Sequence, residues 1–154
     1  MERLTPLAAA FLEAEEADPH ASLVIGSLAV FEGPAPSFEE FRDMVAGRLP
    51  LIPRYRQRIY PAPLHLAAPT WVDDPDFDLS WHLRNTALPS PGGSAEIGRL
   101  IGRVMSRRMD RSRPLWEYWF VEGLTGGRWA LLSKLHHCMV DGVSDGSLSA
   151  DSRS

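Results

Sequence analysis

Residues 115–142, LWEYWFVEGLTGGRWALLSKLHHCMVDG, decide the fold. Aromatic and β-branched residues dominate residues 115–124, and a second apolar run covers residues 128–135. Residues 125–127, Thr-Gly-Gly, separate the two runs. Because such residues favour strands and a short glycine-rich linker favours a tight turn, the pattern predicts two strands joined as a hairpin. The second strand would deliver two adjacent histidines at its end.

Two helices and a strand are predicted before this hairpin. The first helix begins with Thr5 as N-cap and proline in its first turn, and the second begins with the capping box of Ser37 and Glu40. An apolar run between them stops at Gly33-Pro34 and predicts a buried strand. The predicted ranges are residues 5–16 and 37–48 for the helices and residues 22–32 for the strand.

The middle of the chain is predicted as short strands followed by a helix. Prolines interrupt residues 50–69, which leaves room for short strands at residues 55–60 and 70–73. Residues 77–88 are predicted as a further extended segment. The clearest helical periodicity covers residues 94–109. Together these elements predict an α/β fold, a mixed-sheet sandwich with flanking helices.

Composition fits a packed domain, with 44% hydrophobic and 23% charged residues in 154. A net charge of -4 argues against neutralisation of phosphates, so nucleic acid is not an expected partner. The single cysteine, Cys138, excludes an intrachain disulfide. Neither a secretory signal nor an apolar run near the ~20 residues of a spanning helix is present. We expect a cytoplasmic protein that could still lie peripherally on a membrane or a lipid droplet.

His136 and His137 end the predicted second strand, and Asp141 and Gly142 follow after three residues. Neighbouring strand residues face opposite ways, so only one of the two rings is expected to face a given cavity. A neutral imidazole can take the proton of a hydroxyl within hydrogen-bond reach, a contribution of about 10²–10⁴-fold. The motif therefore favours alcohol activation. Asp141 could orient a histidine or pair with an arginine, and Gly142 could let the backbone pass close to a ligand.

Other chemistries fit this motif less well. A zinc site could draw on the side chains around it: His136, His137, Cys138, Asp141 and Asp145. Adjacent histidines on a strand diverge, however, and the other histidines form no second ligand cluster, so no metal is expected. A Cys138 nucleophile paired with His137 would need two neighbouring side chains that point apart. Residues 91–94 lack the lysine and the glycine spacing of a phosphate-binding loop.

Residues 136–142 match the HHxxxDG pattern of acyltransferases that resemble chloramphenicol acetyltransferase, a superfamily that includes peptide-synthetase condensation domains. Three further segments resemble the bacterial wax ester synthase/diacylglycerol O-acyltransferase family. They are residues 4–13, residues 110–117 with the sequence DRSRPLWE, and residues 122–124 with the sequence EGL. The similarity runs from Leu4 to about Gly146. It favours the lipid family over a condensation-type domain that uses carrier-bound acyl groups.

This resemblance implies transfer of a fatty acyl group from acyl-CoA to the hydroxyl of diacylglycerol or a long-chain alcohol. His137 would be the general base that activates this hydroxyl, with no covalent acyl-enzyme. His136 and Asp141 would shape the site, Asp141 by a structural salt bridge, and Gly142 would keep the acyl-CoA channel open. Three residues would be structural or line the channel: Pro114, Leu115 and Trp116. Acyl-CoA is then a substrate, and no cofactor is expected.

The resemblance covers only the N-terminal part of much longer proteins, which are built as two similar halves with the active site in a tunnel between them. We expect residues 1–146 to form an N-terminal acyltransferase half-domain and residues 147–154 a disordered serine-rich tail. A tunnel needs two walls, and the tetrahedral intermediate of acyl transfer needs donors at its oxyanion. The isolated chain is therefore expected to expose apolar surface and to have little or no activity. The alternative function is a catalytically incompetent half-domain that binds a C-terminal partner half or lipid.

Overall fold

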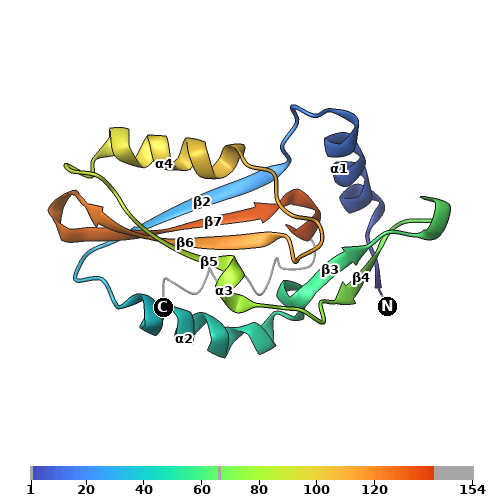
Figure 1. Ribbon diagram of the computed structural model, residues 1–154, viewed down its shortest axis with the longest axis horizontal. Helices are drawn as coiled ribbons and strands as arrows, with labels where there is room; N and C mark the ends of the chain where they lie inside the picture. The colour runs from blue at the N-terminus through green and yellow to red at the C-terminus, as the bar shows by residue number, and fades with distance from the viewer. Residues whose placement is uncertain (1, 66, 141–154) are drawn as a thin grey trace.

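The computed structural model describes residues 2–65 and 67–140, which form two β-sheets with helices packed on them (Figure 1). The helices are α1 (Pro6–Ala17), α2 (Phe38–Arg48), α3 (Leu79–His82) and α4 (Ser94–Ser106). The strands are β1 (Glu2–Arg3), β2 (Val24–Phe31), β3 (Gln57–Tyr60), β4 (Thr70–Asp73), β5 (Leu83–Ala87), β6 (Trp116–Leu124) and β7 (Arg128–His136). Short 3₁₀ turns are η1 (Leu49–Leu51), η2 (Pro53–Arg56), η3 (Pro63–His65), η4 (Thr125–Gly127) and η5 (His137–Met139). None of the helices in these two ranges has the length and apolarity to span a membrane.

The larger sheet has the strand order β2-β7-β6-β5. The strand predicted over residues 22–32 exists, but the prediction that it is buried is wrong, because β2 lies at the edge of the sheet and most of its residues are exposed. β7 pairs antiparallel with β2 and β6, whereas β5 pairs parallel with β6, so the predicted mixed sheet is confirmed. The predicted hairpin is also confirmed, with Phe120 of β6 opposite Leu131 of β7. Gly126 and Gly127 in its turn have φ values of 79° and 70°, which a residue with a side chain rarely adopts.

Helix α4 covers one face of this sheet (Figure 1). Its Leu100 and Val104 pack against Val121 of β6 and Leu132 of β7. The predicted end of this helix at residue 109 is wrong, since the helix ends at Ser106. The cause lies in Lys134 of β7, whose buried Nζ donates to the carbonyl of Val104 at 2.7 Å and to that of Arg107. These bonds occupy the terminal carbonyls of α4 and cap the helix.

The opposite face of the sheet carries the larger core, beneath α2. Phe41 of α2 lies 5.3 Å from the ring of Phe120, and Val45 is fully buried beside it. The predicted capping box at the start of α2 is confirmed, because Ser37 and Glu40 exchange hydrogen bonds of 3.0 Å. The core on this face joins α1, α2 and the three-stranded sheet to β6 and β7.

The second sheet has the order β1-β4-β3 and is antiparallel throughout. Both short strands predicted here exist, although β3 begins at Gln57 because the preceding turn η2 takes up the residues before it. The prediction of an extended segment over residues 77–88 is wrong in its first part. Asp78 accepts the N–H of Ser80 at 3.0 Å and starts the short helix α3, so β5 begins only at Leu83.

Candidate active site

The two motif histidines lie where β7 passes into η5. The N–H of His136 donates to the carbonyl of Leu115 at 3.1 Å, and the N–H of His137 donates to the carbonyl of Leu23 at 2.9 Å. Leu115 and Leu23 directly precede β6 and β2, the two strands that flank β7. Helix α1 packs against η5, as the neighbouring ribbons in Figure 1 show. Two strand starts and one helix therefore hold the motif in place.

His136 is enclosed, with 1% of its surface exposed. Its Nδ1 accepts the N–H of Cys138 at 3.1 Å, so the proton of the neutral ring lies on Nε2. Nε2 lies 3.2 Å from Oε2 of Glu15, at ion-pair distance but outside good hydrogen-bond alignment. Burial lowers the pKa of His136, and the Glu15 carboxylate, which raises it, offsets this only in part. His136 is therefore neutral at pH 7, with the Cys138 N–H on its Nδ1 and the Glu15 carboxylate 3.2 Å from its Nε2.

Glu15 of α1 is a buried carboxylate, 3% exposed. Arg111 Nη2 donates to its Oε1 at 2.8 Å, and the N–H of Leu23 donates to its Oε2 at 3.0 Å. Burial raises the pKa of Glu15, but these hydrogen bonds and the nearby His136 outweigh burial, so the pKa is lowered. Arg111 also donates to Glu16 at 2.7 Å. The ionised Glu15 thus connects α1, the start of β2 and the segment before β6.

His137 occupies a different environment from its neighbour. Its side chain is only partly buried. Its ring lies 5.0 Å from that of Phe11 in α1, centroid to centroid, with the planes tilted by 38°. The structure therefore separates the two histidines: His136 is enclosed, and His137 is only partly buried.

Cys138 does not present a nucleophile. Its side chain is buried, and burial raises the pKa of the thiol to about 12, so the thiolate is scarce at pH 7. In the part of the chain that the structure describes, no three His, Cys, Asp or Glu side chains are arranged to hold a metal ion. Asp141 and Gly142, predicted as site residues, and Asp145 of the zinc alternative lie outside the described residues.

Pro114, Leu115 and Trp116 are buried. The Trp116 ring stacks on Tyr55 at 4.6 Å and on His82 at 4.5 Å, and its Nε1 donates to the carbonyl of Tyr55 at 2.8 Å. These contacts give Trp116 a structural role. Pro114 and Trp116 also border a hollow of about 270 Å³ beside β5 and β6. A channel-lining role for these three residues stays a prediction.

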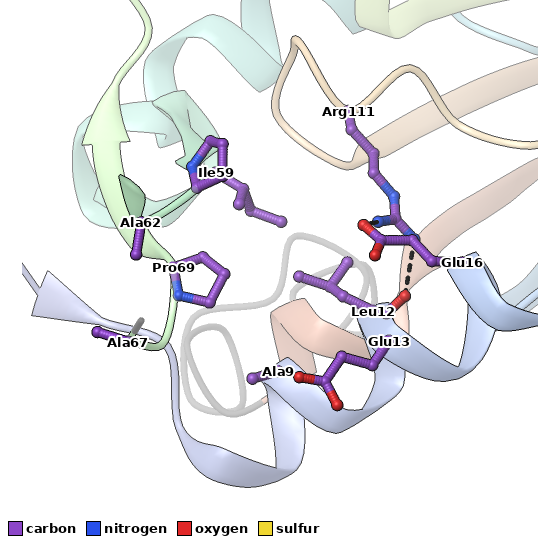
Figure 2. A pocket seen from close by; sticks show the side chains of 10 residues that line it. Ala9, Leu12, Glu13, Glu16, Ile59, Ala62, Ala67, Pro69 and Arg111 are labelled. Atoms are coloured by element: carbon purple, nitrogen blue, oxygen red, sulfur yellow. Dashed lines mark hydrogen bonds and ion pairs between the residues drawn. The ribbon is translucent and has the colours of Figure 1, made fainter. Parts of the chain in front are cut away.

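A second hollow, of about 190 Å³, lies between α1 and the three-stranded sheet. Figure 2 shows Arg111 and Glu16 on one side of this pocket and Ile59, Ala62 and Pro69 on the other. Neither motif histidine lines it. It therefore lies apart from the histidine site, although Arg111 contributes to both.

Glu15 is the site residue that the sequence reasoning missed. The signal was present in the helix register, because Ala8, Leu12 and Glu15 are the buried residues of α1 and have the spacing of an apolar stripe. A carboxylate at a position that should be apolar indicates a buried partner. Nothing in the linear sequence identified that partner as His136, because 121 positions separate the two residues.

Similarity to known proteins agrees with this geometry. The model of the wax ester synthase/diacylglycerol acyltransferase catalytic domain matches residues 4–153. The protein named probable diacylglycerol O-acyltransferase tgs1 of Mycobacterium tuberculosis is 54% identical over 94% of this chain and 31% of its own length. Its relative tgs3, from the same organism, is 44% identical over 79% of this chain and 46% of its own length. The chain thus spans between about a third and a half of these relatives.

Solved structures give the same result. The wax ester synthase/diacylglycerol acyltransferase of Marinobacter aquaeolei VT8 superposes with a TM-score of 0.78 at 34% identity, over 94% of this chain and 35% of that one. The starter condensation domain of rhizomide synthetase RzmA superposes with a TM-score of 0.72 at 13% identity, over 90% of this chain and 31% of that domain, which shows a shared fold. The chain belongs to the wax ester synthase/diacylglycerol acyltransferase family.

Proposed function

We propose that this chain carries the alcohol-activating histidine of an O-acyltransferase that moves a fatty acyl group from acyl-CoA to diacylglycerol or a long-chain alcohol. The observation that carries the proposal is the contrast between the two motif histidines. The ring nitrogens of His136 face the Cys138 N–H and the Glu15 carboxylate, whereas His137 is only partly buried, beside Phe11. Of the two residues, His137 is therefore the one that we assign as the general base.

In the proposed step, His137 takes the hydroxyl proton while the hydroxyl oxygen attacks the thioester carbonyl of acyl-CoA. The new C–O bond forms, the C–S bond breaks, and the imidazolium returns the proton to the departing thiolate. The products are an ester and free coenzyme A, and no covalent acyl-enzyme forms. The raised pKa of Cys138 supports this direct route over a thiol nucleophile.

Activity is proposed for the longer protein that includes the remainder of the family fold, since the chain spans 31% of its relative tgs1. The test is a chimera in which residues 4–140 replace the matching part of tgs1, assayed with labelled acyl-CoA and diacylglycerol. We expect the chimera to form triacylglycerol and His137→Ala to lower kcat by about 10²–10⁴-fold. The variant His20→Ala, at an exposed position, is the matched control. Full activity of the His137→Ala chimera would refute the assignment.

A second candidate, a half-domain that binds the remainder of the family fold, is favoured by the surface of β2. This strand ends the sheet order, and Ile25, Leu28 and Val30 are 36%, 36% and 43% exposed. Exposed apolar side chains on an edge strand favour contact with a partner. We expect the isolated chain to show little or no acyl transfer and to form a stable complex with the rest of tgs1 in size-exclusion chromatography. Robust His137-dependent turnover by the isolated chain would contradict this expectation.

A further inference from the structure

Helix α1 contacts both motif histidines from one face. Phe11 lies against the His137 ring at 5.0 Å, and Glu15 lies 3.2 Å from Nε2 of His136. These two residues are four positions apart, so they project from the same side of the helix one turn apart. The helix therefore contacts both rings at once.

Among the described residues, the neighbours of the Glu15 carboxylate are hydrogen-bond donors. The Leu23 N–H and the Nη2 of Arg111 donate to its two oxygens at 3.0 Å and 2.8 Å, and Nε2 of His136 stands 3.2 Å from Oε2. An ionised carboxylate can only accept hydrogen bonds, so it favours the His136 tautomer with the proton on Nε2. In that tautomer Nδ1 is free to accept.

His136 and Leu23 each accept one more hydrogen bond, from a backbone N–H next to the His137 side chain. Nδ1 of His136 accepts the N–H of Cys138 at 3.1 Å, and the carbonyl of Leu23 accepts the N–H of His137 at 2.9 Å. The backbone N–H groups of His137 and Cys138 thus donate to two residues, Leu23 and His136, that both contact Glu15. With the opposite tautomer of His136, an N–H would point at the N–H of Cys138, and that hydrogen bond would be lost.

We propose that Glu15 is a positioning residue for His137: it holds His136 in the Nε2–H tautomer and Leu23 in place, and the two together fix the backbone turn from which the His137 ring projects. Outer partners of this kind orient histidines at other functional sites. The proposal deepens the proposed function, on which it rests for the role of His137.

The test uses the full 154-residue chain labelled uniformly with ¹⁵N, and long-range ¹H–¹⁵N correlation spectra of the imidazole rings. His136→Gln identifies the His136 signals by their loss. In the unmodified chain we expect an unprotonated Nδ1, a protonated Nε2, and a scalar coupling across the hydrogen bond from the Cys138 N–H to Nδ1. A ring protonated at Nδ1, or a folded chain without this coupling, would overturn the proposal.

Glu15→Gln supplies the perturbation, because its amide group can present an N–H to Nε2 of His136. We expect the Nδ1 and Nε2 shifts of His136 to exchange or average, and the ring shifts of His137 to move with them. The matched control is Glu16→Gln, which also removes a carboxylate partner of Arg111 but has no contact with His136. Identical ring spectra for the two variants would refute the positioning role. Should Glu15→Gln fail to fold, the spectra of the unmodified chain decide the question.

Kinetics of the chimera then separate the two proposals. Glu15→Gln is expected to lower kcat by about 10²-fold with little change in KM, as for a displaced catalytic group. If the spectra show the expected Nε2–H tautomer of His136 but the chimera never transfers acyl groups, the proposed function is refuted and the positioning role of Glu15 is retained. If the chimera is active and Glu15→Gln leaves its His137-dependent kcat unchanged, the positioning role of Glu15 is refuted and the proposed function is retained.

Discussion

Two buried charges stabilise the structure near the histidine end of β7, and their hydrogen-bond partners differ in kind. Glu15, at the histidine end, is held by a guanidinium, a backbone N–H and an imidazole. Lys134, beneath α4, is held by two helix carbonyls, with Glu117 at 3.9 Å. Lys134 is 1% exposed, so both groups left water on folding.

The difference shows that satisfying a buried charge can have two different structural consequences. A buried charge needs partners wherever it lies. The hydrogen bonds of Lys134 go to a helix end, so they fix where α4 ends. The partners of Glu15 include His136, so its effect extends to the turn that carries His137. Four expected outcomes test this comparison.

The largest effect is expected from Arg111→Met, which leaves the buried Glu15 charge without its cation. Breaking such a pair from one side typically costs about 3–5 kcal/mol. Urea unfolding at pH 7 measures the loss. Arg99→Met should cost under about 1 kcal/mol, because the Arg99 side chain is exposed and the Glu96 carboxylate still accepts the N–H of Gly93. Equal losses of unfolding free energy in the two variants would contradict a special role for the buried Glu15 charge.

Lys134→Met is expected to cost about 2 kcal/mol, because the carbonyls of Val104 and Arg107 lose their donor. The loss should appear in the free energy of unfolding and in faster amide exchange in the last turn of α4. The His137 ring spectrum should not change. Arg103→Met, an exposed residue of the same helix, is the control. A His137 spectrum shifted as far in Lys134→Met as in Glu15→Gln would remove the contrast between the two charges.

Acidification should destabilise the chain by an amount on the order of 1 kcal/mol per buried histidine. Burial lowers the pKa of both His136 and His82, so the unfolded chain binds more protons below about pH 6.5 and stability falls as pH falls through that window. The lowered pKa of Glu15 extends the loss to still lower pH. Unfolding curves of His136→Asn from pH 7.5 to 5 should show a shallower slope, and those of His20→Asn an unchanged one.

Glu16→Gln should have the smallest effect, under about 0.5 kcal/mol, because Glu16 is exposed and its pair with Arg111 is screened. Denaturant midpoints measured in low and high salt would check this. A loss as large as that of Arg111→Met would mean that Glu16, and not Glu15, is the main partner of the guanidinium.

The sequence predicted those elements whose signals are local. The hairpin of β6 and β7, the N-cap at Thr5 and the capping box at Ser37 were all readable because each depends on neighbours within a few residues. The end of α4 was not readable, since the donor that caps it, Lys134, comes from a strand 30 positions away. The cap that starts α3 is local, but the burial of His82 in that helix was not readable, because its Nδ1 bonds to the carbonyl of Trp116, 34 positions away.

The site was predictable only in part for the same reason. The histidine motif is contiguous, and its resemblance to a family gave His136 and His137 their expected roles. Glu15 and Arg111 come from segments that lie far from the motif along the chain and meet only in the fold. Their contribution is an ionised carboxylate against a neutral imidazole, and that arrangement depends on burial, which a sequence pattern does not reveal.

The four-residue spacing between Phe11 and Glu15 fixes how many helical residues can separate the two contacts that α1 makes with the histidines. An α-helix turns about 100° per residue, so one residue inserted between these positions would rotate one of the two side chains away from the histidines. An insertion at residues 18–21 would instead disturb the bonds of Arg108 to the carbonyls of Asp18 and Ala21 and the bond of the Leu23 N–H to Glu15. Length variation is therefore expected to be rejected both within α1 and in the segment that follows it, a pattern that systematic insertion scanning can reveal without any knowledge of substrate.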